Sequence, residues 1–385
     1  PHSVIEGAAI AAFAIGANEG YVYVRAEYPL AVERLKLAIA QAEEYGLIGD
    51  RILGSTFSFH LKIKEGAGAF VCGEETALMS SIEGQRGMPK PKPPFPAQQG
   101  LWGKPTIINN VETLACVPAI FLKGAAWFRG FGTTASPGTK TFALSGKLQN
   151  TGLAEVPFGL TLRELIFDIG GGVMNEGKFK AAQIGGPSGG CLTKEHLDMP
   201  IDYDSLQKAG AIVGSGGLVV LDDKTCMVET ARYFMNFTQS ESCGKCVPCR
   251  EGTNRMLEVM ERIVAGKGNV RDLDLLQEVA AVVRDASLCA LGKTAPNPVL
   301  STMRYFPEEY HAHIVDHRCP AGECAALRVY SIDADKCRGC GLCARKCPVK
   351  AISGEPKKPH VIDTEACTHC GVCHSVCPFA AVSIS

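Results

Sequence analysis

The chain has 385 residues, a formal net charge of −1, 46% apolar residues and 21% charged residues. This length predicts two to four domains with hydrophobic cores of their own. A near-neutral charge without long basic runs argues against a general polyanion partner such as nucleic acid. No segment approaches the ~20 continuous apolar residues of a membrane span. Eighteen cysteines are too dilute for a disulfide scaffold, and their clustering indicates metal binding in a reducing compartment.

Residues 1–135 alternate helix and strand signals, as an α/β domain does. Helices are predicted over 4–17 and from Pro29 to Gly46, and strands over 20–25 and 57–63. The second helix is expected to bury one face, made of Leu30, Leu35, Ala38, Ile39 and Ala42. Strand–helix–strand is the start of a parallel sheet, and such sheets bind ligands beyond the carboxyl ends of their strands.

A glycine-rich segment follows the second strand at that edge. Gly66, Gly68 and Gly73 lie between the strand and a helix that is expected to begin near Glu74. Glycines let the backbone approach a ligand, and a helix start offers N–H donors to an anionic group. The alternative is a tight strand–helix turn in which Glu74 and Glu75 complement the helix dipole. The proline-rich run 88–96 is expected to be a surface loop, and residues 109–113 a helix start.

Three cysteines stand close together in the middle of the chain. Cys243, Cys246 and Cys249 have C-x2-C-x2-C spacing, and Cys289 is the candidate fourth ligand. Neighbouring cysteines at this spacing cannot form disulfides without severe strain, whereas three thiolates can bind three corners of a [4Fe–4S] cluster. Zinc and unligated thiols are the alternatives, but zinc sites usually take cysteines in pairs. Predicted helices at 227–237, 250–264 and 273–284 would hold such a centre rigidly.

The C-terminal segment contains a duplicated cysteine motif. The run Cys337-x2-Cys340-x2-Cys343-x3-Cys347, followed by proline, recurs thirty residues later as Cys367-x2-Cys370-x2-Cys373-x3-Cys377. This is the pattern of bacterial two-cluster ferredoxins, in which the fourth cysteine of each run binds the other cluster. One [4Fe–4S] cluster would take Cys337, Cys340, Cys343 and Cys377, and the other Cys367, Cys370, Cys373 and Cys347.

The remaining cysteines give weaker signals. Cys319 and Cys324 follow three histidines (His311, His313 and His317), so a zinc ion is one interpretation. The other is unligated or transiently disulfide-bonded cysteines at a domain join. Cys191 and Cys226 have no metal-ligand spacing and are interpreted as buried thiols.

Several stretches together resemble one known family. They are YVYVRAEY (21–28), GAGAFVCGEETAL (66–78), PPFPAQQGLWG (93–103) and NNVETL (109–114). Jointly they resemble the flavin- and NADH-binding (51 kDa-type) subunit of respiratory complex I and its soluble relatives, and the resemblance extends to about residue 317. The implied domains are an FMN- and NAD(H)-binding α/β domain (1–135, truncated at its N-terminus), an SLBB-type β-grasp-like scaffold (136–225), a helical bundle with [4Fe–4S] (226–317), a linker (318–331) and a two-cluster ferredoxin-like α+β domain (332–385).

The resemblance also implies site residues. Those expected at FMN are Phe70, Gly73, Glu74, Glu75, Asn109, Asn110 and Thr113, in the context of the Gly66 and Gly68 loop. Those expected at the nicotinamide dinucleotide, NAD(H) or NADP(H), are Glu75, Lys92 and Phe95. The position of Phe70 is usually tyrosine, so a hydroxyl hydrogen bond is absent here. The family's upstream glycine-rich flavin loop is missing too, so we expect a longer N-terminal part.

These parts predict an electron relay, because a flavin exchanges hydride with a nicotinamide and single electrons with clusters. No acid–base or nucleophilic catalytic residue is expected. The ferredoxin module resembles that of the flavin subunit in cytoplasmic NAD(P)-linked or electron-bifurcating hydrogenases. Its implied partners are a thioredoxin-like [2Fe–2S] subunit, a hydrogenase or other catalytic iron–sulfur subunit, and ferredoxin. The alternatives are the same subunit of a formate dehydrogenase or of a ferredoxin:NAD(P)+ oxidoreductase, and an electron-conducting adapter without flavin chemistry of its own.

Overall fold

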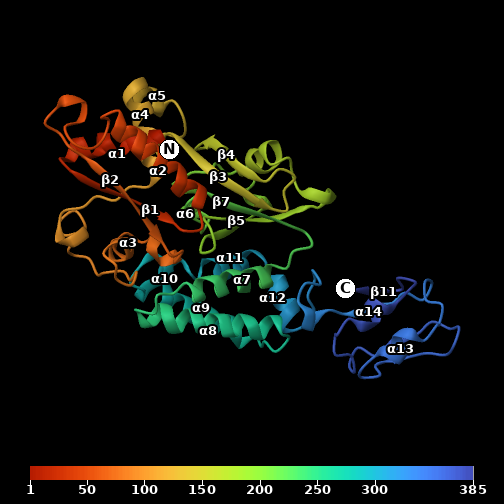
Figure 1. The fold of residues 1–385 in the computed structure, drawn as a ribbon. Coiled ribbons are helices and arrows are strands. Elements are labelled where there is room, and N and C mark those ends of the chain that lie inside the picture. The colour runs from red at the N-terminus through yellow and green to blue at the C-terminus, as the bar shows by residue number, and fades with distance from the viewer. Residues whose placement is uncertain (385) are drawn as a thin grey trace. The chain divides into compact units, whose positions relative to one another are not determined.

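The computed structural model describes residues 1–384, which form two compact units (Figure 1). The first unit contains residues 1–139 together with 241–245 and 288–291, and the second contains the rest of the chain. Ser385, the last residue of the predicted ferredoxin-like domain, lies outside the described residues.

The first unit is an α/β domain built on two parallel strands. Its elements are α1 (His2–Ile15), β1 (Glu19–Arg25), α2 (Pro29–Glu44), β2 (His60–Gly66), α3 (Glu75–Ile82), α4 (Val111–Lys123) and α5 (Ala125–Arg129). Strand β1 pairs in parallel with β2 from Glu19↔His60 to Arg25↔Gly66. The predicted strand–helix–strand unit is confirmed, so the segment after β2 leaves the sheet at the carboxyl ends of both strands.

The buried face of α2 differs from the prediction in one respect. Leu30 is predicted to lie in the core but is 61% exposed, whereas Val32 is buried beside Ala38 and Ile39. At 3.6 residues per turn Leu30 points about half a turn away from Ile39, while Val32 lies within about 20° of it. The stripe that packs on the sheet therefore begins at Val32.

The second unit begins with a mixed five-stranded sheet. Its elements are β3 (Thr139–Gly146), β4 (Gly152–Pro157), β5 (Phe179–Ile184), β6 (Gly190–Thr193), α6 (Tyr203–Lys208) and β7 (Gly217–Asp222). The strand order is β4-β3-β7-β5-β6; β7 pairs in parallel with β3 and antiparallel with β5, which is antiparallel to β6. A large apolar core, including Phe142, Leu162 and Leu206, fills this domain. The β-rich character expected for this region is confirmed.

Helices follow the sheet: α7 (Met227–Ser240), α8 (Val247–Val264), α9 (Arg271–Ala286), α10 (Ala290–Thr294), α11 (Asn297–Tyr305) and α12 (Pro307–Ile314). The three long predicted helices are confirmed as α7, α8 and α9. Their shared core includes Met235, Met256 and Leu276, and it continues into the buried side chains of Cys319 and Cys324. Among residues 1–384, no helix has the length and hydropathy that a membrane crossing requires.

The C-terminal domain has two similar halves. Its elements are β8 (Tyr330–Ile332), α13 (Leu342–Lys346), β9 (Ile352–Ser353), β10 (Val361–Ile362), α14 (Val372–Val376) and β11 (Val382–Ile384). Strand β8 pairs with β11 and β9 with β10, both antiparallel. Gly341 and Gly371, thirty residues apart, precede the two helices with φ of 70° and 74°. The backbone thus repeats as the cysteine motif does.

Candidate flavin and metal centres

The glycine-rich loop packs closely against the end of β1. A Cβ on Gly66 would lie 2.3 Å from Tyr23 Oη, and one on Gly68 would lie 2.2 Å from Glu27 Oε1. Gly68 also has a φ of 87°. These two glycines are therefore required by packing and backbone conformation. Gly73 is different, because it is exposed and nothing lies within 4 Å of its Cβ position.

The start of α3 is capped by a carboxylate from within the chain. Glu74 Oε2 accepts hydrogen bonds from the backbone N–H groups of Thr76 and Ala77, at 2.8 and 2.9 Å. These are two of the donors that a helix start would offer to an anionic ligand. The expectation that the donors are available is therefore wrong for these two groups. The alternative, in which the acidic side chain complements the helix start, is the one observed.

Lys92 lies between the two predicted glutamates. Its Nζ donates to Glu75 Oε1 and is 3.6 Å from Glu74 Oε1. The hydrogen bond to Glu75 is the main cause that raises the pKa of Lys92. Three of the predicted cofactor residues are thus brought together in one charged cluster. Phe95 is 54% exposed in the following loop, which leaves its ring face accessible.

The residues predicted on the fourth helix are exposed. Asn109, Asn110 and Thr113 lie at the start of α4, and all three are open to solvent. Asn110 is the N-cap residue, but its side chain makes no capping hydrogen bond to the helix. Capping therefore does not account for this side chain.

The segment that carries Cys243 is fastened to the flavin-like domain on both sides of the cysteine. The backbone N–H of Phe70, in the glycine-rich loop, donates to Glu241 Oε2 at 2.9 Å. Lys245 Nζ donates to the backbone carbonyl of Pro89 at 2.5 Å. These bonds hold the Cys243 segment in a defined position within the first unit.

The other three cysteines of the predicted central cluster lie at helix ends. Cys246 is the N-cap residue of α8, Cys249 is buried in the first turn of that helix, and Cys289 lies between α9 and α10. The sequence predicts the whole motif in a loop; instead Pro248 allows the helix to begin at Val247, before the third cysteine. Cys243 and Cys289 belong to the first compact unit, and Cys246 and Cys249 to the second.

A buried hydroxyl lies next to Cys249. Within residues 1–384, Ser287 Oγ is the one buried side-chain nitrogen or oxygen atom that has no hydrogen-bond partner. A Cβ placed on Gly292 would be 2.4 Å from this oxygen and 3.1 Å from Cys249 Cβ, so both groups adjoin the same small space. Unpaired buried hydroxyls are costly, which points to a missing acceptor. A cluster sulfide at Cys249 is an acceptor of the required kind.

The C-terminal domain brings its eight cysteines together in two sets of four. One pocket is lined by Cys337, Cys340, Cys343 and Cys377. The other is lined by Cys347, Cys367, Cys370 and Cys373. These are the two crosswise sets predicted from the sequence. The donor chemistry of both pockets, four thiols on mostly apolar walls, suits iron–sulfur clusters.

Backbone donors address the fourth cysteine of each run in the same way. The N–H of Ala351 lies 3.3 Å from Cys347 Sγ, and the N–H of Ala381 lies 3.4 Å from Cys377 Sγ. Hydrogen bonds to sulfur favour the thiolate form that ligates iron and tune the potential of a bound cluster. The duplication therefore extends to the groups around the ligands.

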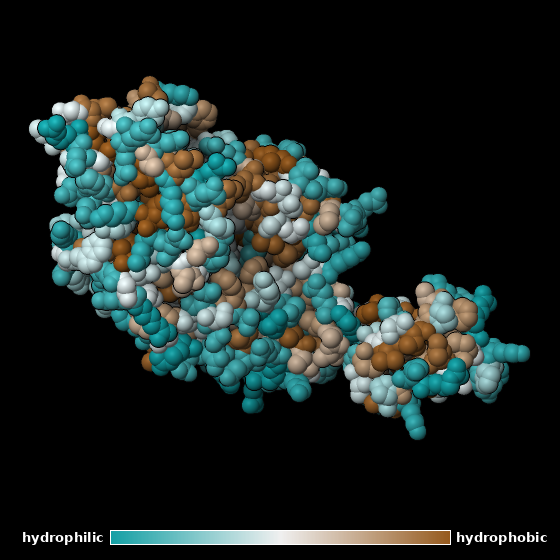
Figure 2. All heavy atoms as spheres, viewed as in Figure 1, coloured by the Kyte–Doolittle hydropathy of each residue, from teal (hydrophilic) through white to brown (hydrophobic). Residues whose placement is uncertain are grey.

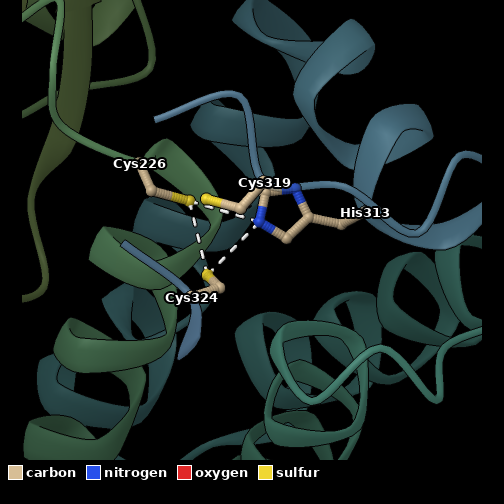
Figure 3. A group of neighbouring side chains, drawn as sticks. All are labelled: Cys226, His313, Cys319 and Cys324. Atoms are coloured by element: carbon tan, nitrogen blue, oxygen red, sulfur yellow. Dashed lines mark hydrogen bonds between the residues drawn. The ribbon is translucent and has the colours of Figure 1, made fainter. Parts of the chain in front are cut away.

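A separate group of three cysteines and one histidine lies in the helical bundle (Figure 3). Cys226 precedes α7, His313 is on α12, and Cys319 and Cys324 lie in the loop that follows. All four are buried, and their ligand atoms lie within 4.8 Å of one another. The group closes the end of the bundle with side chains from three separate segments.

The distances in this group suit one tetrahedral ion. Cys226 Sγ is 3.8 Å from Cys324 Sγ, and His313 Nε2 is 3.4 and 3.3 Å from these two sulfur atoms. Zn–S bonds of ~2.3 Å at tetrahedral angles place two sulfurs about 3.8 Å apart. His313 Nδ1 is 2.7 Å from the carbonyl of Glu309, which assigns the proton to Nδ1 and leaves Nε2 as the ligand atom.

The sequence interpretation of these cysteines is incomplete. It treats Cys226 as a simple buried thiol, but the Cys226 sulfur contacts two other members of the group. Of the three upstream histidines only His313 takes part, while His311 and His317 are exposed. Cys191 remains isolated from the group, and burial raises its pKa to about 12. Spacing could not reveal Cys226, because it lies 93 residues before Cys319.

Three family descriptions match successive parts of the chain. Residues 1–119 match the Nuo51 FMN-binding domain, and residues 229–313 match the NADH-ubiquinone oxidoreductase-F iron-sulfur binding region. Residues 330–384 match the 4Fe-4S dicluster domain.

Similar curated proteins cover most of the chain. HndC, a component of the NADP-reducing hydrogenase of Solidesulfovibrio fructosivorans, is 59% identical over 94% of this chain and 74% of the relative. The F 2 component of the NADH-quinone oxidoreductase of Rhizobium meliloti is 48% identical over 83% of this chain and 76% of the relative. The chain belongs to this family of oxidoreductase subunits.

Solved structures of the family agree with the fold. The NAD+-reducing [NiFe]-hydrogenase in the H2-reduced state has a chain that superposes with a TM-score of 0.74 at 36% identity. The match covers 82% of the present chain and 52% of the hydrogenase chain, so the present chain spans about half the length of that relative.

The matched ranges also locate the candidate sites within the family. The flavin and nucleotide residues fall inside the FMN-binding match, and the cluster cysteines fall inside the two iron–sulfur matches. Cys226, Cys319 and Cys324 lie outside all three ranges, and His313 is the last residue of one of them. The Cys3His group is thus a feature of the segments that join the matched domains.

Proposed function

We propose that this chain is the NAD(P)H-oxidising or NAD(P)+-reducing flavin subunit of a cytoplasmic multi-subunit oxidoreductase, and that it carries three [4Fe–4S] clusters. The observation that carries the proposal is the pair of four-cysteine pockets in a chain whose N-terminal part matches an FMN-binding domain. Bound FMN would exchange hydride with the nicotinamide and single electrons with iron–sulfur centres.

The residues of the first unit would position the flavin and the dinucleotide. Gly73, exposed and without neighbours at its Cβ position, would let a ligand approach the loop after β2. Lys92 would offer its ammonium group to a phosphate or ribose, in exchange with Glu75. Phe95, which is half-exposed, would stack on the adenine or the nicotinamide. Asn109, Asn110 and Thr113 would supply polar contacts to the FMN ribityl and phosphate groups.

Cysteines would hold the three clusters in the sets that spacing predicts. Cys243, Cys246, Cys249 and Cys289 would bind the central cluster, and the two crosswise sets would bind the C-terminal clusters. The hydrogen bond from Phe70 N–H to Glu241 would fix the flavin loop relative to the first ligand of the central cluster. Such positioning matters because electron transfer slows steeply when centres move apart.

The relatives guide the choice of complex. One is part of an NADP-reducing hydrogenase, and a matching solved structure is of an NAD+-reducing hydrogenase. On that basis we favour a hydrogenase-type complex of the electron-bifurcating kind, with a thioredoxin-like [2Fe–2S] subunit and a hydrogenase subunit as partners. A formate dehydrogenase or a ferredoxin:NAD(P)+ oxidoreductase with the same subunit is the second candidate. A flavin-free electron-conducting adapter is the third.

We also propose that the Cys3His group binds one structural zinc ion. Four buried ligand atoms, a fixed histidine tautomer and sulfur separations suited to a single ion support this assignment. Closed sites with four protein ligands are structural rather than catalytic.

The test of the main proposal is cofactor analysis of the full-length protein purified anaerobically with its complex. We expect one FMN and twelve iron atoms with twelve acid-labile sulfides for this chain, three [4Fe–4S] signals in EPR of the reduced protein, and bleaching of the flavin by NADH or NADPH. Zinc without sulfide in the C-terminal domain would overturn the relay. Clusters without flavin binding would leave only the adapter.

A further inference from the structure

We infer that the exposed surface around the Cys337–Cys340 loop docks a small acidic protein that carries a one-electron iron–sulfur centre. The inference rests on the proposed cluster at Cys337, Cys340, Cys343 and Cys377. It adds the place at which electrons pass between this chain and a soluble carrier, and the chemistry that recognises the carrier.

The two halves of the C-terminal domain differ sharply in charge. Residues 330–360 contain seven lysines and arginines and three carboxylates, whereas residues 361–384 contain two carboxylates and no lysine or arginine. Across the duplication, the cations Lys336, Arg338, Arg345, Lys346 and Lys350 correspond to the uncharged Ala366, Thr368, Ser375, Val376 and Ala380. Both halves fold alike and bring four cysteines to a pocket. The fold and the ligation therefore do not require these cations.

The cations of the first half are open to solvent. All seven are exposed, and long hydrophilic side chains project from the C-terminal domain in Figure 2. Two of them are neutralised locally, because Lys336 pairs with Asp333 at 3.2 Å and Lys358 pairs with Glu355 at 2.7 Å. Among the described residues, no carboxylate lies within ion-pair distance of the other five, so their charge faces outward.

Several of these cations gather at the loop that carries the first cluster ligands. Arg338 lines the same pocket as the four cysteines. Arg345 Nη1 donates to the carbonyl of Cys340 at 3.3 Å, so its side chain lies over this loop. Cys340 itself is exposed, whereas Cys343 of the same pocket is buried. The pocket is thus reached from solvent on the side where the cations stand.

A second segment adds its charge to the same place. The backbone N–H of Lys357 donates to the carbonyl of Gly339 at 3.0 Å. A Cβ on Gly339, whose φ is 64°, would lie 2.4 Å from the backbone nitrogen of Lys358. Glycine thus allows the 357–358 turn to pack directly on the cysteine loop. The surface defined by Arg338, Arg345, Lys357 and Lys358, named here the basic rim, therefore surrounds the exposed edge of the pocket.

This arrangement suits a carrier that must approach closely and leave quickly. Complementary charge steers a partner to the correct face and raises the association rate by roughly 10- to 1,000-fold without requiring a large buried area. One electron would pass from the reduced [4Fe–4S] centre of the carrier to the oxidised cluster behind the basic rim, or in reverse, and no bond forms or breaks. A nucleic acid would gain nothing from the proximity of a cluster, and no aromatic stacking platform accompanies these cations in the described part of the domain.

The test uses the complete complex with its clusters and, as the probe, a purified acidic two-[4Fe–4S] ferredoxin as electron donor for NAD(P)+ reduction. The rim variant carries Arg345→Gln, Lys357→Gln and Lys358→Gln. The matched control carries Lys194→Gln, Lys208→Gln and Lys224→Gln, which removes the same charge from exposed positions elsewhere. A third variant, Arg345→Lys with Lys357→Arg and Lys358→Arg, keeps the charge of the rim.

At an ionic strength of about 50 mM, the rim variant should raise the KM for ferredoxin about tenfold and leave kcat unchanged. Its KM should also depend less on salt than that of the unaltered complex. The matched control and the charge-conserving variant should retain the original KM, and reduced methyl viologen should drive NAD(P)+ reduction equally in all four proteins.

An unchanged KM and salt dependence in the rim variant, with cluster EPR signals intact, would overturn the docking surface alone. Dissociation of another subunit in the rim variant would also overturn it, because the surface would then hold a permanent component of the complex. Equal binding of the ferredoxin and of a nucleic acid of the same charge would reduce the rim to a general polyanion site. Absence of the cluster signals in the unaltered complex would overturn the proposed function as well.

Discussion

Ser287 shows how one side chain can report on a missing group. Its hydroxyl is buried, has no partner among residues 1–384, and adjoins Cys249 two residues before Cys289 in the chain. A hydroxyl in this position can donate to a sulfide or thiolate of the central cluster, and such a bond stabilises the reduced, more negative state. No sequence pattern points to this residue, because serine is common at the ends of helices.

The substitution Ser287→Ala should lower the midpoint potential of the central cluster by on the order of 50 mV, since one hydrogen bond to the reduced form is lost. EPR-monitored redox titration measures this shift. In the cluster-free protein the same change should stabilise the fold by ~1 kcal/mol or more, because an unsatisfied buried hydroxyl is removed.

The control is Ser301→Ala, which removes a buried hydroxyl that accepts from Cys191 N–H at 3.1 Å and donates to the Asn297 carbonyl at 2.7 Å. It should destabilise the cluster-free protein and leave the potential unchanged. If both variants left the potential where it was and destabilised the protein, Ser287 would be an ordinary core residue.

At the scale of elements, the Cys3His group ties three segments to one point. The start of α7, the end of α12 and the loop 319–324 meet there, and hydrogen bonds reinforce the junction: Cys226 N–H donates to Glu323 Oε2 at 2.7 Å, and Met227 N–H donates to Glu309 Oε2 at 3.0 Å. Glu309 also pairs with Lys180 at 2.6 Å. The segment that leads to the ferredoxin-like domain is therefore anchored in the core of the bundle.

Replacing a ligand should release this anchor. His313→Ala or Cys319→Ser is expected to remove one zinc ion per chain, to lower the melting temperature by roughly 5 °C or more, and to make residues 315–330 sensitive to protease. Elemental analysis and limited proteolysis measure these outcomes. Cys191→Ala, at a buried thiol outside the group, should keep the zinc and the protease resistance. An unaltered protein that contains no zinc, or equal losses in the Cys191 variant, would contradict the assignment.

Elements and sites differ in how far the sequence predicts them. Long helices such as α8 and the parallel β1–β2 pair are predictable because their apolar periodicity depends on neighbours within a few residues. The misassignment of Leu30 arises because several apolar positions in α2 permit more than one stripe. Glu74 is recognisable as a candidate complement to the helix start, but only the structure shows that it occupies two donors of α3.

The same distinction holds for the metal centres. The C-terminal cysteine sets follow from local spacing and a known crossover rule, and the structure brings those sets together. The Cys3His group joins residues up to 98 positions apart, from Cys226 to Cys324, so it could be completed only after folding had placed them together. Ligand groups built from distant elements are in general beyond spacing arguments, even where each residue is visible.

For the whole molecule, the central claim is that electrons pass from the flavin through the Cys243–Cys289 centre to the C-terminal clusters. The most direct measurement is rapid-freeze EPR combined with flavin absorbance after NADH or NADPH is mixed with the complete complex carrying Cys246→Ala. Removal of this ligand should leave reduction of the flavin at its normal rate and abolish fast reduction of the two C-terminal clusters. The two-cluster signals should appear unchanged after dithionite. If the C-terminal clusters were still reduced at the normal rate by the nucleotide, electrons would leave the flavin by another route, and the relay through this chain would be contradicted.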